Sequence, residues 1–137
     1  SNLDPLKLGL AVLHGFAYLS TESVLTLSGV IFQSANYLTF VSNHSRKFSV
    51  GNHSYLIRRM KNEFLYQSAG IEDQNGVKTA TVERAVADLL YFNPQSYFDN
   101  RQAINWQKVK EIQKEVGFKL CYPNQKTLYI KSKCTGC

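Results

Sequence analysis

The sequence predicts an α+β fold with short N-terminal helices, a central antiparallel meander sheet, and amphipathic helices packed on one side of it. The chain has 137 residues, of which 44% are hydrophobic and 19% charged, values typical of one globular domain. Apolar residues recur with helical spacing at both ends of this domain, whereas the middle is rich in β-branched and aromatic residues. We therefore expect helices in residues 1–35, mainly strands in 36–80, helices in 81–117, and a hairpin and tail in 118–137.

Two short helices are predicted near the N-terminus. Asp4 can cap free amides and Pro5 fits the first helical turn, so a helix should begin there. Its apolar stripe ends near Gly15, a residue that favours helix termination. A second helix should begin at Ser20 or Thr21 and end near Gly29.

The middle of the chain changes to strand-like sequence. We expect strands at residues 37–41, 48–50, 54–58, 63–66 and 77–80. Polar turn sequences at 51–52 and 73–76 separate some of them. Consecutive strands joined by short turns are typical of an antiparallel meander.

The strongest helix signal begins at Thr81, a good N-cap, with Glu83 placed in the first turn where the helix dipole favours an acid. The helix should end before Pro94. Its apolar face consists of Val82, Ala85, Val86, Leu89 and Leu90. A further helix is predicted over 106–116, capped by Asn105 and followed by Gly117, and residues 118–121 and 127–130 should form a closing hairpin.

The composition points to a cytoplasmic protein without cofactor or metal. No apolar stretch approaches the ~20 residues of a membrane helix, and the first residues lack a signal-peptide pattern. Three cysteines within the last 17 residues do not make a disulfide framework. Cys134 and Cys137 form a lone CxxC, which we interpret as part of a tail, and His44 and His53 as surface residues whose turns could approach each other.

A catalytic role is not expected, because no nucleotide-binding or hydrolase motif is present. A nuclease-like enzyme remains the alternative, with candidate carboxylates Glu22, Glu63, Glu83 and Asp88. However, no acid-x-Lys strand motif occurs, and Glu83 and Asp88 are turned apart on their helix. Asp88 follows Arg84 by four positions and could pair with it instead.

The net charge of +6 is unevenly distributed along the chain. Residues 46–61 contain five basic and no acidic residues, a pattern that favours a nucleic-acid or acidic partner but also fits a solvated face. The predicted binding residues are Arg46, Lys47, Arg58, Arg59 and Lys61. Strand alternation places Arg58 and Met60 on one face and Arg59 on the other, so the five form one surface only if the turn brings the first two around. Tyr55 and Tyr66 could stack on bases, although core packing is the more common role of such tyrosines.

Three stretches carry a family resemblance. LDPL (3–6) leads to AYLSTESVLTLSGVI (17–31), which is similar to a block written YVS-x-ES-A-L-x-x-x-G-L-I. YLTFVS (37–42) is followed by basic residues, and ATVERAVADLLY (80–91) resembles A-[ST]-P-E-[KR]-A-L-x-D-L-L, with Val82 in place of proline. Together, residues 3 to about 92 resemble the part of AbiEi-family antitoxins that follows their winged-helix domain.

This resemblance implies a non-catalytic antitoxin and transcriptional regulator of a bacterial type IV toxin–antitoxin system, which serves abortive infection and phage defence. The implied functional partner is a nucleotidyltransferase-like toxin, opposed without a stable inhibitory complex. Nucleic-acid partners would be the protein's own promoter DNA or the RNA target of the toxin. A purely structural dimerisation or docking module is a further alternative, and the sequence leaves the oligomeric state open.

Overall fold

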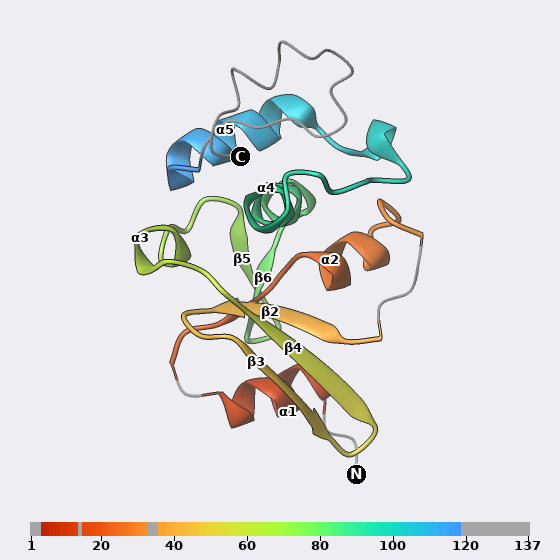
Figure 1. Ribbon diagram of the computed structural model, residues 1–137, viewed down its shortest axis with the longest axis vertical. Helices are drawn as coiled ribbons and strands as arrows, with labels where there is room; N and C mark the ends of the chain where they lie inside the picture. Colours follow the sequence, from red (N-terminus) through yellow and green to blue (C-terminus); the bar gives the residue numbers. More distant parts are fainter. Residues whose placement is uncertain (1–3, 14, 33–35, 119–137) are drawn as a thin grey trace.

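A computed structural model describes residues 4–13, 15–32 and 36–118 (Figure 1). It confirms an α+β fold, with a six-stranded sheet in the order β3-β4-β2-β1-β6-β5. The strands are β1 (Tyr18–Leu19), β2 (Leu38–Ser42), β3 (Arg46–Val50), β4 (His53–Arg59), β5 (Ile71–Gln74) and β6 (Val77–Ala80). The helices are α1 (Pro5–Val12), α2 (Glu22–Leu27), α3 (Asn62–Leu65), α4 (Val82–Phe92) and α5 (Trp106–Val116), with a 3₁₀ turn at Arg101–Ala103.

The sheet is mixed, so the predicted antiparallel meander is wrong. β4 lies between β2 and β3, pairing in parallel with β2 and antiparallel with β3. β1 pairs antiparallel with β2 and in parallel with β6. The burial of each strand explains this order. Residues Thr39 to Ser42 of β2 are buried, which suits a central strand, whereas β3 is largely exposed and basic, which suits an edge.

Three local predictions also fail. β1 lies within the segment expected to be helical, and its two residues are too few to show a strand period. Residues expected to form a strand at 63–66 instead belong mainly to α3, with Leu65 buried. The turn predicted at 73–76 is shorter, because β5 continues to Gln74 and the reversal occurs at Asn75 and Gly76, both with positive φ.

The helix predictions hold more closely. The Asp4 carboxylate accepts a hydrogen bond from the Leu6 amide and caps α1, although the helix ends at Val12 rather than near Gly15. Thr81 and Asn105 cap α4 and α5 as predicted, accepting from the amides of Arg84 and Lys108. Of the closing hairpin at 118–121 and 127–130, all but Phe118 lies outside the described residues.

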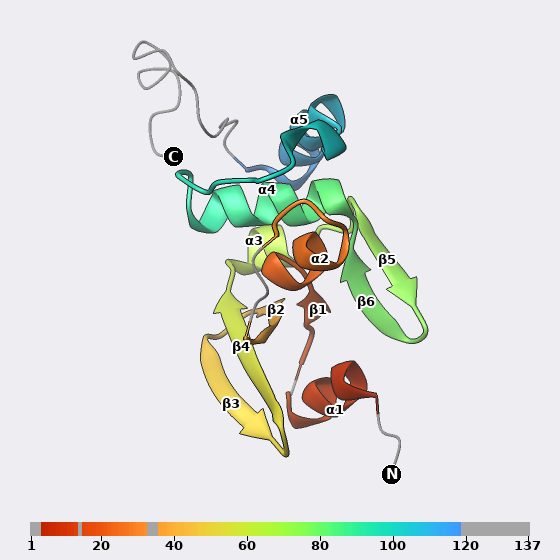
Figure 2. The same cartoon turned by 90° about the vertical axis from the view of Figure 1, so that its right-hand side faces the viewer.

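The helices form layers around the sheet. α5 packs on α4, and Figure 2 shows this pair towards one end of the molecule, α2 between α4 and the sheet, and α1 at the other end. Strand alternation directs the side chains of β4 to the two faces of the sheet. Tyr55 on one face donates a hydrogen bond to the Pro5 carbonyl of α1, whereas Arg58 on the other face contacts Phe92 of α4. Within the described part of the chain, none of the helices has the length and apolar character needed to span a membrane.

Candidate functional site

The predicted basic residues gather at one end of the β3–β4 pair, where they line a groove of about 510 Å³. We call it the basic groove; its lining residues are Ser45, Arg46, Lys47, Leu56, Ile57, Arg58, Arg59 and Phe92. These side chains include four cations and no acid. Figure 2 shows β3 and β4 side by side at one edge of the sheet, with β4 running up towards α4.

Strand register decides which cations share a face. Arg46 is opposite Ile57 and Lys47 is opposite Leu56. Lys47 therefore lies on the same face as Arg58, whereas Arg46 shares a face with Arg59. The four cations therefore line one hollow although they come from both faces of the two strands.

Lys61 does not line the groove. It lies beyond the end of β4, exposed, immediately before α3. Met60, expected to share a face with Arg58, is instead outside the strand and buried, with its sulfur 3.7 Å from the hydroxyl of Tyr18.

The exposed cations contact aromatic rings. Arg46 lies 4.9 Å from the centroid of Phe48, and Lys47 lies 5.3 Å from that of Tyr37. These contacts limit the motion of both side chains on the surface. Tyr55 is buried against Phe48 and Phe40, as core packing predicts, and is closed to a stacking base.

Arg58 is held differently, by an ion pair to a residue 36 positions earlier in the chain. Its Nη2 donates to Oε2 of Glu22 on α2 at 2.6 Å, and its guanidinium lies 5.5 Å from the Phe92 centroid. Both side chains are partly exposed, at 26% and 29%. The second oxygen of Glu22 and the Nε of Arg58 are buried and have no hydrogen-bond partner.

A second polar cluster is fully buried and lies between α4 and β1. Arg84 Nε donates to Asp88 Oδ1 at 3.0 Å, and both side chains are 0% exposed. The other oxygen of Asp88 accepts from the hydroxyls of Tyr18 at 2.9 Å and Ser20 at 2.7 Å. The predicted pairing of Arg84 with Asp88 is therefore confirmed. The hydrogen bond from Tyr18 of β1 to Asp88 is a contact that the sequence does not predict.

The guanidinium of Arg84 also holds the segment that leads into β5. Its Nη1 donates to the carbonyl oxygens of Gln67 at 2.9 Å and Ala69 at 2.7 Å, and its Nη2 donates to the Tyr18 hydroxyl at 3.0 Å. Burial, together with the nearby Asp88 carboxylate, raises the pKa of the Tyr18 phenol well above its usual value. The phenol consequently stays protonated and donates to Asp88 while it accepts from Arg84.

Three of the four candidate carboxylates for a nuclease make contacts within the protein, whereas Glu63 is exposed in the first turn of α3. Glu22 pairs with Arg58, and Asp88 belongs to the buried cluster. Glu83 accepts a hydrogen bond from the Asn105 amide at 3.2 Å, which links α4 to the start of α5. The three do not form a shared acidic site.

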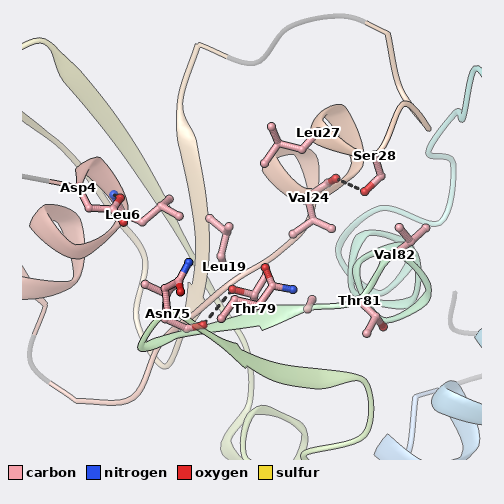
Figure 3. Close-up of a pocket in the computed structure, with 13 residues that line it drawn as sticks. Asp4, Leu6, Leu19, Val24, Leu27, Ser28, Asn75, Thr79, Thr81 and Val82 are labelled. Atoms are coloured by element: carbon pink, nitrogen blue, oxygen red, sulfur yellow. Dashed lines mark hydrogen bonds between the residues drawn. The ribbon is translucent and has the colours of Figure 1, made fainter.

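Figure 3 shows a second pocket, of about 300 Å³, bordered by α1, α2 and β6. Leu6, Leu19 and Val24 line it, and the exposed Leu27 stands at its rim. Asp4 is the acidic residue of the lining, and its carboxylate caps α1. The rest of the lining is mixed, with hydroxyl and amide side chains beside the apolar ones: Ser28, Gln74, Asn75, Thr79 and Thr81.

A metal site is not evident in the part of the chain that the structure describes, where no group of three or more His, Cys, Asp and Glu side chains could hold an ion. His44 precedes β3 and contacts Asn43, whereas His53 pairs with Val50 at the other end of the hairpin, so the two do not approach each other. Cys134 and Cys137 lie outside the described residues.

Comparisons of the chain with protein-family models, with curated proteins and with solved structures gave no match.

Proposed function

We propose that the chain is a non-catalytic antitoxin or regulator domain of a type IV toxin–antitoxin system, which opposes a nucleotidyltransferase-like toxin and acts through macromolecular contact at the basic groove. Its nucleic-acid partner would be the protein's own promoter DNA or the RNA target of the toxin.

The observation that carries the proposal is the contact between two of the three sequence stretches on which the family resemblance rests, residues 17–31 and 80–91. The hydroxyls of Tyr18 and Ser20 in the first stretch donate to Asp88 in the other, and Arg84 donates to the Tyr18 hydroxyl in return. An accidental resemblance would give no reason for these polar positions to meet. Their meeting supports the view that the blocks specify one fold, and the family's function is then inferred by analogy.

Binding is favoured over catalysis by where the charged groups lie. Glu22, Glu83 and Asp88 are all used in internal contacts, whereas Arg46, Lys47 and Arg59 are exposed beside a hollow. A cationic surface of this kind attracts polyanions without chemistry.

The test is growth of bacteria that express the product of the gene adjacent to this one, with and without the chain. We expect wild-type protein to restore growth and the double variant Lys47→Gln/Arg59→Gln to fail. Lys108→Gln/Lys114→Gln removes the same charge from exposed positions on α5 and should restore growth like the wild type. Failure of the wild type beside a demonstrably toxic neighbour would contradict the proposal, as would equal rescue by the groove variant.

The nuclease-like alternative makes a different prediction. It requires cleavage of RNA or DNA that depends on a divalent metal and on at least one of Glu22, Glu83 and Asp88. Because the Glu83 carboxylate accepts from the Asn105 amide, we expect Glu83→Gln to loosen the contact between α4 and α5 without affecting any cleavage.

A further inference from the structure

Arg58 is placed to bind an anion in the basic groove. It stands near the end of β4 and lines the groove together with Lys47 from the neighbouring strand, on the same face of the sheet. Phe92 supports the guanidinium from α4. An arginine fixed in this way presents its remaining donors with little loss of side-chain freedom.

The contact with Glu22 uses only part of this capacity. One nitrogen of Arg58 meets one oxygen of Glu22, while Arg58 Nε and Glu22 Oε1 are buried without partners. A two-bond arginine–carboxylate contact would satisfy all four atoms. Arg58 and Glu22 therefore each keep one polar atom without a hydrogen bond. The unpaired donor, Arg58 Nε, belongs to a residue that lines the basic groove beside three further cations.

From these contacts we infer that the basic groove binds the phosphates of a single-stranded nucleic acid, and that Glu22 is an internal competitor that a phosphate displaces from Arg58. This inference rests on the proposed function, in which the basic groove is the contact surface. It adds the kind of ligand that the groove binds. A phosphate has the charge and the two oxygens needed to engage Arg58 through Nε and Nη2 together. Once freed, Glu22 at the N-terminus of α2 becomes accessible to water.

The shape of the groove favours a single strand. Its volume of about 510 Å³ is in the range of pockets that hold one small molecule, and its lining comes from the ends of two neighbouring strands and from Phe92. Leu56 and Phe92, both partly exposed, add apolar area beside the cations. Cationic grooves with apolar and aromatic walls are typical of single-strand binding, in which bases contact the walls and phosphates the cations.

The matched control for Glu22 is Glu72, an exposed residue of β5 at the opposite edge of the sheet. Glu22→Gln and Glu72→Gln raise the net charge by the same amount, so the difference between them reports effects local to the groove. The same comparison in an Arg58→Gln background separates loss of the ion pair from loss of a nearby negative charge.

The experiment measures fluorescence anisotropy of a labelled 12-nucleotide single-stranded RNA, with the same RNA as a duplex and an oligo-glutamate peptide as competitors. We expect Glu22→Gln to tighten binding of the single strand about 3- to 10-fold, and Glu72→Gln to change it less than about 2-fold. In an Arg58→Gln background, Glu22→Gln should have no effect beyond that of Glu72→Gln. Should Glu22→Gln fold poorly, Lys47→Gln at an exposed position should still weaken binding and lower the salt dependence.

Equal effects of the two glutamate variants would overturn the role of Glu22. Stronger competition by the peptide or by the duplex would overturn the assignment to a single strand. Absence of RNA binding by every variant would overturn the inference but not the proposed function, because growth rescue in the co-expression assay reports on antitoxin activity separately.

Discussion

At the scale of single residues, the buried pair of Arg84 and Asp88 does most to define the interior. Six hydrogen bonds of 2.7–3.0 Å join Arg84 and Asp88 to each other, to the hydroxyls of Tyr18 and Ser20, and to two backbone carbonyls outside α4. A buried ion pair of this kind contributes little net stability compared with apolar residues, but breaking it leaves an uncompensated charge. Its role is to fix the position of β1 and of the segment before β5 relative to α4.

We predict that Asp88→Asn lowers the free energy of unfolding by about 3–5 kcal/mol, because the guanidinium of Arg84 then stays buried without a counter-charge. Urea denaturation followed by circular dichroism measures this. Glu115→Gln, which removes one acidic charge at an exposed position of α5, should change stability by less than about 0.5 kcal/mol. A loss below about 1 kcal/mol for Asp88→Asn would show that the pair is not closed in solution.

At the scale of elements, capping residues decide how well the sequence predicts structure. α4 and α5 begin where Thr81 and Asn105 indicate, since a cap and the apolar face that follows are local signals. The order of the strands in the sheet cannot be predicted from local signals of this kind. β2 pairs with β4 rather than with the next strand along the chain, and this choice depends on burial of both faces of β2, which only the folded molecule shows.

In the candidate site, too, local sequence features can be predicted whereas contacts between distant segments cannot. The run of basic residues at 46–61 is visible in the sequence and contains the four cations that line the groove. The ion pair between Glu22 and Arg58 joins two elements far apart in the chain, as do the contacts of Tyr18 and Ser20 with Asp88. No local pattern identifies such partners. Lys61 belongs to the same run of basic residues but lies beyond the end of β4 and does not line the groove, because a charge run does not reveal where a strand ends.

Helix α1 gives a test in which packing and helix propensity disagree. Alanine is more favourable than glycine inside a helix by about 1 kcal/mol, so propensity alone predicts that Gly9→Ala stabilises the protein. A Cβ at this position would collide with the Tyr55 ring, whose Cδ2 would be 2.7 Å away. We predict a loss of about 1–3 kcal/mol, typical of overpacking.

Thermal or urea denaturation of Gly9→Ala decides between the two effects. Lys114→Ala, at an exposed position of α5, serves as a control in which only propensity acts, and it should change stability by less than about 0.5 kcal/mol. A Gly9→Ala variant more stable than the wild type would mean that α1 does not pack on Tyr55 as described.

At the scale of the whole molecule, the described residues place opposite charge at the two edges of the sheet. β3 carries Arg46 and Lys47 at one edge, and β5 carries Glu72 and Asp73 at the other. Asp73 also lies 3.7 Å from Lys78 on β6, so the acidic edge is partly neutralised. The basic edge keeps its exposed charge beside the groove, which orients a polyanion towards it.

The measurement that tests the central claim most directly is the salt dependence of the affinity for single-stranded RNA. It compares the wild type with the two double variants of the growth assay, Lys47→Gln/Arg59→Gln and Lys108→Gln/Lys114→Gln. Each phosphate that a cation neutralises contributes roughly −0.7 to the slope of log K against log salt concentration. We predict a wild-type slope of about −2 to −3, a shallower slope by about 1.4 for Lys47→Gln/Arg59→Gln, and an unchanged slope for Lys108→Gln/Lys114→Gln. An affinity that stays constant between low and moderate salt, or an equal change in both variants, would contradict the assignment of the basic groove as a polyanion-binding site.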